Sequence, residues 1–281
     1  TVIELITQRY SCRTYEHTPI GLDKRRPLEE YLRLMAAGPL GSPLRFKLLA
    51  AGDEDRDALR GLTTYGLIRG ATGFVLGAVG AAARDMEDFG YAAEQVVLLA
   101  TGLGLGTCWL GGTFRRSRFA ERLALRPDEQ MPCVLAIGIA SGRRSLVDRV
   151  TRLGAGSDRR QPWQHLFFDG NWDQPLPQEA AGAYRTPLEM VRLAPSASNR
   201  QPWRVLRRGE AWHFYLQRTP GYDRVSEPFS GHSDLQRVDM GIALYHFELT
   251  AQELRLAGRW ATAAEAAGAP GPAEYVLSWL P

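Results

Sequence analysis

The chain has 281 residues, of which 44% are hydrophobic and 23% are charged, and its formal net charge is +3 at pH 7. This length and hydrophobic content are sufficient for one large or two medium globular domains with a substantial core. The net charge is small, and the sequence does not show the excess of basic residues that is typical of nucleic-acid-binding proteins. We therefore expect no nucleic-acid partner.

The three cysteines, Cys12, Cys108 and Cys133, are widely spaced along the chain. No Cys-x-x-Cys pair occurs and no histidine clusters near them, which argues against a disulfide framework and against a zinc site. We therefore expect no metal site and a reducing, cytoplasmic location.

Two apolar segments could be mistaken for targeting or membrane segments. The N-terminal run T-V-I-E-L-I-T-Q-R contains Glu4 and lacks a small-residue cleavage site, which argues against a signal peptide. The longest apolar region, residues 91–110, is interrupted by Glu94, Gln95 and several glycines. It predicts a buried helix rather than a membrane span, so we expect no membrane partner.

Residues 2–10 are expected to form a short amphipathic helix that leads into an arginine-rich segment. Arg9, Ser11 and Arg13 alternate along the chain, so their side chains point the same way in an extended backbone. The planar guanidinium suits phosphate, and the serine adds a neutral hydroxyl donor. The pattern predicts an anion-binding site, although such a charge run alone is also typical of a solvated face.

Several regular elements are expected before residue 142. Residues 27–37 begin with proline and two glutamates, a typical helix start, and a loop then runs into a strand through L-G-S-P-L-R-F-K-L-L-A-A-G. Further along, the sequence predicts a strand at residues 72–79, a long buried helix at 87–102 and a core strand at 132–140. The glycine-rich run G-L-G-L-G-T-C-W-L-G-G follows the long helix and, taken alone, indicates a helix C-cap and a turn.

The most informative run is residues 193–203, which read L-A-P-S-A-S-N-R-Q-P-W. Pro195 and Pro202 forbid a continuous helix here, so we expect a loop between a short helix at 187–193 and an extended segment from Trp203. Its side chains offer donors and acceptors that suit a flat heteroaromatic ring edged with carbonyls and ring nitrogens. The polar residues concerned are Ser196, Ser198, Asn199 and Gln201. The alternative is an ordinary connector in which Ser and Asn bond to their own backbone.

The chain contains an internal repeat. The run D-F-G-Y-A from Asp88 matches D-M-G-I-A from Asp239, and the same offset (239 − 88 = 151) relates Trp109 to Trp260. Pro39 and the predicted helix before it correspond to Pro195 and the predicted helix before it, at an offset of 156 (195 − 39). The strand predicted at 132–140 has a weaker sequence match at 273–280. Several matches in the same order indicate an internal duplication.

Three motifs resemble those of the nitroreductase superfamily of FMN-dependent oxidoreductases. They are R-x-S-x-R from Arg9, the run G-L-G-T-C-W-L-G-G, and P-S-x-x-N-x-Q-P-W from Pro195. The resemblance implies that Arg9 and Ser11 contact the FMN phosphate and that Arg13 lies near the N1/O2 edge of the flavin. It also implies that Gly111 and Gly112 let the backbone approach the flavin face.

The resemblance implies further cofactor-binding residues. In the family a basic residue just before a C-terminal proline reaches the FMN phosphate; here Arg160 aligns best, and Arg159 is the alternative. The loop residues expected at the flavin are Pro195, Ser196, Ala197, Ser198, Asn199 and Gln201. No catalytic side chain is expected, because the flavin carries the chemistry. Two departures concern residues 61–70, which lack the usual polar residues, and Gln161, which stands where the family often has Lys.

The two halves have lost complementary motifs. Residues 1–165 keep R-x-S-x-R, the glycine-rich run and Arg160, whereas residues 166–281 keep the P-S-x-x-N-x-Q-P-W loop but not R-x-S-x-R. Ordinary nitroreductases are intertwined homodimers with FMN at the interface, and this chain resembles the single-chain family of putative TM nitroreductases. We therefore expect an α+β fold with a mainly antiparallel sheet flanked by helices and two intertwined, pseudo-symmetric halves. We also expect one FMN site and a monomer.

The resemblance implies an oxidoreductase that takes hydride from NAD(P)H and reduces a nitroaromatic, a quinone or a similar small acceptor. The alternative is a non-catalytic protein of the same fold that binds a flavin or nucleotide weakly or not at all. Flavin-dependent deiodination or ring cleavage would need a substrate lid, and no segment of the sequence is identified as one.

Overall fold

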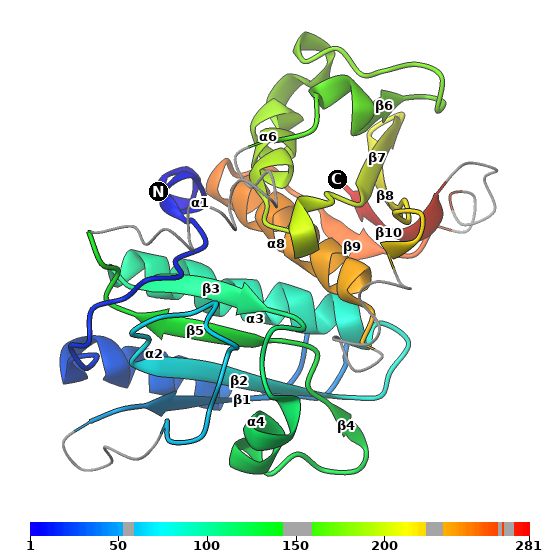
Figure 1. The fold of residues 1–281 in the computed structure, drawn as a ribbon. Helices are drawn as coiled ribbons and strands as arrows, with labels where there is room; N and C mark the ends of the chain where they lie inside the picture. Colours follow the sequence, from blue (N-terminus) through cyan, green and yellow to red (C-terminus); the bar gives the residue numbers. More distant parts are fainter. Residues whose placement is uncertain (53–58, 143–158, 223–232, 264–265, 267–272) are drawn as a thin grey trace.

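The computed structural model describes residues 1–52, 59–142, 159–222, 233–263, 266 and 273–281. These residues form two five-stranded sheets, one in each half of the chain, with helices packed against both (Figure 1). The α+β class expected from the sequence is confirmed. Within the described ranges, no helix is long and apolar enough to cross a bilayer.

The first half is built around one antiparallel sheet. Its described elements are α1 (Val2–Gln8), α2 (Leu22–Leu34), β1 (Leu44–Ala50), β2 (Gly73–Gly80), α3 (Asp85–Gly102), β3 (Gly106–Leu110), α4 (Arg116–Leu123), β4 (Glu129–Gln130) and β5 (Val134–Gly138). The strand order is β1-β2-β5-β3, and β4 pairs with β2. The central strands β2 and β5 are buried along almost their whole length, which explains their unbroken apolar sequences.

The second half repeats this plan with a mostly antiparallel sheet. Its described elements are η1 (Trp163–His165), β6 (Phe167–Asp169), η2 (Glu179–Tyr184), α6 (Arg185–Leu193), η3 (Ala197–Asn199), β7 (Trp203–Arg208), β8 (Ala211–Leu216), α8 (Leu235–Glu253), β9 (Arg259–Ala261) and β10 (Glu274–Leu280). The strand order is β6-β7-β8-β10-β9, and only β6 and β7 pair in parallel within the described sheet.

The long helices α3 and α8 pack against each other at the centre of the molecule. A side chain on Gly90 of α3 would overlap the carbonyl oxygen of Val238, and one on Gly241 of α8 would overlap the carbonyl oxygen of Glu87. The two glycines are related by the repeat offset (241 − 90 = 151). Each copy of the repeat therefore uses the same glycine to bring the two helix backbones together.

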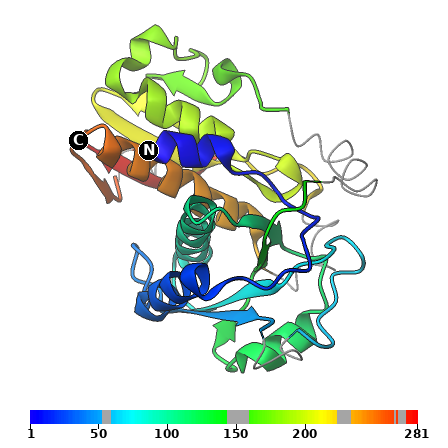
Figure 2. The same cartoon turned by 90° about the vertical axis from the view of Figure 1, so that its left-hand side faces the viewer.

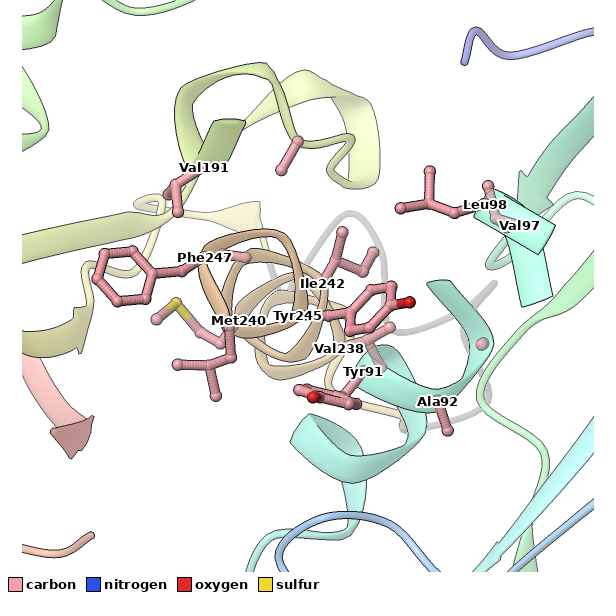
Figure 3. Close-up of a cluster of buried hydrophobic side chains, with 14 of the residues drawn as sticks. Tyr91, Ala92, Val97, Leu98, Val191, Val238, Met240, Ile242, Tyr245 and Phe247 are labelled. Carbon is pink, nitrogen blue, oxygen red and sulfur yellow. The ribbon is translucent and has the colours of Figure 1, made fainter. Parts of the chain in front are cut away.

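Apolar side chains complete this crossing. Figure 3 shows Val238, Ile242 and Tyr245 of α8 beside Tyr91 of α3. The rings of Tyr91 and Tyr245 lie 4.9 Å apart between centroids at an interplanar angle of 62°. This edge-to-face pair belongs to the core that both halves share.

The N-terminal helix crosses from the first half to the second. Helix α1 packs against α3, but also against α6 and α8 (Figure 2). The backbone N–H of Val2 donates to Glu253 Oε1 at 2.7 Å, at the far end of α8. The segment that follows α1 is thereby held at the seam between the halves. The predicted boundary between residues 165 and 166 stays a prediction.

Most predicted elements occur within two residues of their predicted ends, but one helix differs by more. The helix predicted at residues 27–37 runs from Leu22 to Leu34, and Pro27 lies inside it. Pro27 removes the backbone bond to the carbonyl four residues earlier, and the burial of Leu28 and Leu32 offsets this cost. The helix predicted at residues 2–10 ends at Gln8, because Arg9 takes an extended conformation (φ −59°, ψ 130°). Helix α4 and strands β3, β4, β6, β8 and β9 are not among the predicted elements.

Candidate functional site

A cavity of about 370 Å³ lies at the seam between the halves. Its wall combines the segment after α1, the end of β3, Arg160, the loop before β7, and one face of α8. The predicted residues that line it are Arg9, Ser11, Arg13, Gly111, Gly112, Arg160, Pro195, Ser196, Ala197, Ser198 and Asn199. The structure thus brings together residues from both halves that are far apart in sequence.

The arginine-rich segment runs along the edge of the first sheet. Ser11 forms a parallel bridge with Thr107 of β3, and the N–H of Cys12 donates to the Thr107 carbonyl at 2.8 Å. This pairing keeps the backbone extended, as predicted from the alternation. Arg9, Ser11 and Arg13 therefore all reach the cavity wall.

Arg9 is a buried cation at this wall. Its side chain is only 6% exposed, and its Nε lies 3.9 Å from Glu94 Oε1. Among the described residues, Nε has no hydrogen-bond partner. Burial lowers the pKa of the Arg9 guanidinium, and the nearby Glu94 carboxylate opposes this shift. An anion in the cavity would supply the hydrogen-bond acceptors that a buried guanidinium requires.

The loop before β7 has a strained backbone. Ser198, Asn199 and Gln201 adopt left-handed φ values of 50°, 54° and 52°. Such conformations are unfavourable for residues other than glycine and persist where surrounding contacts enforce them. The Gln201 N–H donates to Ser196 Oγ at 2.9 Å, and the Ala197 N–H donates to Asp239 Oδ1 at 2.9 Å. These bonds fix the loop in a shape that turns Ser196, Ser198 and Asn199 to the cavity.

Asn199 joins the loop to the end of the first half. Its Oδ1 accepts a hydrogen bond from Arg160 Nη1 at 2.8 Å, and its Nδ2 donates to the Arg159 carbonyl at 2.8 Å. Arg160 Nη2 also donates to the Leu193 carbonyl at 3.0 Å. Arg160 lies on the cavity wall, whereas Arg159 contributes its backbone carbonyl to the loop.

Gln201 departs from the sequence-based expectation. It is 2% exposed and does not line the cavity. Its amide donates to the Asn199 carbonyl at 3.1 Å, and its Oε1 accepts the Gln161 N–H at 2.8 Å. The Gln201 side chain therefore lies behind the loop and stabilises its backbone instead of contacting a ligand in the cavity.

The glycine pair at the end of β3 meets the opposite half. A Cβ on Gly111 would lie 2.7 Å from Leu235 Cδ1, so the glycine allows α8 to approach. Arg116 Nη2 donates to the Gly111 carbonyl at 3.1 Å and fixes this peptide from the outside. Gly111 and Gly112 both line the cavity.

Asp239, which marks the internal repeat, also lines the cavity although the sequence did not predict it there. Its Oδ1 holds the loop through Ala197, while its Oδ2 has no hydrogen-bond partner among the described residues. Burial raises the pKa of the Asp239 carboxyl well above its ordinary value. The aspartate that recurs at the repeat offset was the available signal for this position.

Two further titratable groups of the wall, Cys133 and Tyr222, stay neutral near pH 7. Burial raises the pKa of the Cys133 thiol to about 12 and that of the Tyr222 hydroxyl to about 12. The wall carries the guanidinium groups of Arg9, Arg13 and Arg160 against the single carboxyl of Asp239, and this balance favours an anionic ligand. In the part of the chain that the structure describes, no group of three or more His, Cys, Asp or Glu residues could hold a metal ion.

Three solved structures resemble this chain over its whole length or over about half of it. A crystal structure of a "putative nitroreductase" from Thermotoga maritima is similar over 99% of this chain and 93% of that one, with 20% identity and a TM-score of 0.61. A nitroreductase family protein from Clostridium difficile matches 54% of this chain and 91% of its own, with 19% identity and a TM-score of 0.41.

A "putative nitroreductase" from Desulfovibrio desulfuricans, solved in complex with FMN, matches 53% of this chain and 94% of its own, with 27% identity and a TM-score of 0.40. No curated protein matches the chain. The model of the family described as "Putative TM nitroreductase" matches residues 1–251, and the chain belongs to this family.

Proposed function

We propose that this chain is an FMN-dependent oxidoreductase of the nitroreductase type, with one flavin site between its halves. In this proposal NAD(P)H donates the hydride, and the acceptor is a nitroaromatic, a quinone or a similar small molecule. One observation carries it: the R-x-S-x-R segment, Arg160 and the loop of the second half line a single cavity. Each half alone would supply only part of such a site.

The wall suits the phosphate of FMN. Arg9, Ser11 and Arg160 offer donors from two separate segments, and Arg9 is a buried cation whose Nε lacks a partner within the described residues. Charge-assisted hydrogen bonds to phosphate would compensate the cost of burying that charge. The cavity volume of about 370 Å³ lies in the range of about 300–1,000 Å³ that is usual for small-molecule sites.

The remaining wall suits a flat ring. Gly111 and Gly112 present backbone without side chains, and Ser196 and Ser198 present small hydroxyls. We assign Arg13 to the pyrimidine edge, where a fixed cation stabilises negative charge. Bound FMN would supply the hydride and electron transfer, and the protein would supply binding, orientation and electrostatics.

Two residues of the loop motif have supporting roles in this proposal. Asn199 acts through Arg160, because its amide oxygen accepts a hydrogen bond from that guanidinium. Gln201 acts on the loop backbone through Asn199 and residue 161. Both would position the groups that contact the cofactor.

The proposal is tested by reconstituting the purified protein with FMN and mixing it anaerobically with NADH or NADPH. We expect one of the two nucleotides to bleach the flavin absorbance and a quinone or nitroaromatic to restore it. Flavin that binds but is reduced by neither nucleotide would contradict the oxidoreductase proposal. It would favour the alternative of a non-catalytic protein of the same fold.

We also propose that the chain works as a monomer, because α3 and α8 already form the contact that two subunits would otherwise share. Sedimentation should show a species near the chain mass of 31.2 kDa. A dimer that persists on dilution would contradict this proposal.

A further inference from the structure

A buried charged cluster lies directly behind the cavity wall, where the two halves meet. Glu94 of α3 and His246 of α8 are both fully buried. Glu94 Oε2 accepts a hydrogen bond from Trp109 Nε1 at 3.0 Å, and Glu94 Oε1 lies 3.0 Å from His246 Nε2. The Arg9 Nε lies 3.9 Å from the same Oε1. Trp109 and Arg9 also line the cavity, so the cluster connects to it through two of its members.

The hydrogen bonds of His246 determine how many protons the cluster holds. Its Nδ1 lies 3.0 Å from the Met190 carbonyl oxygen, which can only accept. Nδ1 therefore carries a proton. The contact between Nε2 and Glu94 Oε1 joins two acceptors unless a second proton lies on one of them. The Glu94–His246 pair thus holds this second proton and is neutral overall, whichever partner carries it.

This proton changes the net charge that an anion in the cavity experiences. A lone Glu94 carboxylate beside Arg9 would cancel the charge of the guanidinium, and the cluster would be neutral. With the proton held by the pair, the cluster keeps a net charge of +1, while Glu94 still offers an oxygen that orients Arg9. At such short range inside a protein, one unit of charge is worth more than tenfold in affinity for an anion.

We propose that His246 is a positioning residue for the anion site: its hydrogen bond to Glu94 holds the proton that leaves the charge of Arg9 available to a phosphate group. The inference rests on the proposed function, in which Arg9 binds the FMN phosphate. It adds a residue from the second half, on α8, to the phosphate site of the first half.

The test compares FMN with riboflavin, which lacks the phosphate, in the full-length protein. In His246→Gln, a glutamine can keep one hydrogen bond but holds no extra proton, so the cluster becomes neutral. We expect FMN affinity to fall on the order of tenfold and riboflavin affinity to stay unchanged. In the double variant Glu94→Gln/His246→Gln the cluster regains a charge of +1, and FMN affinity should largely recover.

His213→Gln is the matched control. His213 is another buried histidine, and its Nδ1 lies 2.6 Å from Ser278 Oγ in the second sheet, away from the cavity wall. This variant should bind FMN and riboflavin like the parent. Circular dichroism of all variants checks that they are folded.

Three results would overturn the inference. They are unchanged FMN affinity in His246→Gln, an equal loss for FMN and riboflavin, and no recovery in the double variant. Parallel titration with inorganic phosphate, followed by thermal stabilisation, separates this inference from the proposed function. A parent that binds phosphate but not FMN contradicts the proposed function alone, and the same variants then test the inference on phosphate. A parent that binds neither overturns both.

Discussion

Asp88 and Asp239 occupy the same position in the two copies of the long helix, yet they hold their loops differently. Asp88 accepts two backbone hydrogen bonds, from the N–H of Leu40 at 2.7 Å and from that of Ser42 at 2.8 Å. Asp239 accepts one, from the N–H of Ala197, and its Oδ2 has no partner within the described residues. The aspartate of the first half holds its loop at two points, whereas the aspartate of the second half holds its loop at one point, and that loop lines the cavity.

Gly38 lies at the contact between the first loop and its aspartate. A Cβ at this position would overlap the Asp88 side chain, so loop and helix are in direct contact. The first loop has also lost the Asn, Gln and Trp of the motif. In the first copy the aspartate therefore anchors the backbone of its loop.

The repeat-related tryptophans Trp109 and Trp260 also bond differently placed glutamates. Trp109 Nε1 donates to Glu94, 15 residues before it, whereas Trp260 Nε1 donates to Glu248 Oε2 at 2.6 Å, 12 residues before it. The hydroxyl of Tyr91, from the opposite helix, donates to Glu248 Oε2 at 2.7 Å. Within the described ranges no arginine forms an ion pair with Glu248. Among the described residues, Trp109 and its glutamate thus lie beside an arginine and a histidine, whereas Trp260 and its glutamate lie beside a tyrosine.

The largest expected effect is on stability, at the crossing of α3 and α8, where both copies of the repeat place the same glycine. Gly90→Ala and Gly241→Ala should each destabilise the protein by about 3 kcal/mol, because the new methyl groups overlap backbone carbonyls of the opposite helix. Urea denaturation measures the loss. Gly102→Ala at the end of α3 is the control: its Cβ would lie 3.6 Å from Leu5 Cδ2, so stability should change by less than about 1 kcal/mol. Tolerance of either central substitution would contradict the symmetric crossing.

The next largest effect is on FMN affinity, which should depend on Arg9 at the cavity but not on the loop of the first half. Arg9→Ala should weaken FMN binding by about 1.5–3 kcal/mol, the usual range for a hydrogen bond to a charged group. Leu40→Ser restores a serine to the first loop and should leave FMN affinity nearly unchanged, since no R-x-S-x-R segment accompanies that loop. Flavin fluorescence titration measures both. A strong effect of Leu40→Ser would mean that the first loop takes part in binding.

The paired aspartates should respond differently to the same substitution. Asp88→Asn loses an acceptor for one of two buried N–H groups and should cost about 1–3 kcal/mol of stability. Asp239→Asn keeps the bond to Ala197, so it should be neutral or stabilising near neutral pH.

The pH dependence sharpens this contrast. Because the folded-state pKa of Asp239 is raised above its ordinary value of 3.8, the folded protein keeps a proton that the unfolded chain has released. The contribution of Asp239 to stability therefore falls as the pH rises from 3.8 towards the raised folded-state pKa. The advantage of Asp239→Asn over the parent should be larger at about pH 8 than at about pH 5 in denaturant titrations. If the stability advantage of Asp239→Asn became smaller as the pH rises, the folded protein would be stabilising the ionised carboxylate of Asp239.

The smallest effect concerns the loop itself. Asn199→Gly accepts the left-handed backbone at this position (φ 54°) but removes the bond to Arg160, and should weaken FMN binding by about 1 kcal/mol. Asn171→Gly, in a turn where Asn171 Oδ1 accepts the Asp173 N–H, should bind FMN like the parent. An Asn199 variant that is folded and binds like the parent would show that residues 195–203 are only a connector.

The sequence predicts those structural features that depend on the local residue pattern or on the internal repeat. The alternation of Arg9, Ser11 and Arg13 and the apolar run of β5 are both found as expected. The start of α2 is not, since the burial of Leu28 and Leu32 outweighs the cost of Pro27 inside the helix. Neither the inward turn of Gln201 nor the pairing of Glu94 with His246 could be predicted, because both depend on contacts between segments that only folding brings together.

We infer that only one of the two duplicated sites binds FMN, and the number of flavins bound per chain measures this. The protein is saturated with FMN, freed of excess ligand and denatured, and the released flavin is compared with the protein concentration. We predict a ratio of one FMN per chain. A ratio near two would show that both copies bind and would contradict the asymmetry described above, and a ratio of zero after incubation with excess FMN would contradict the flavin site itself.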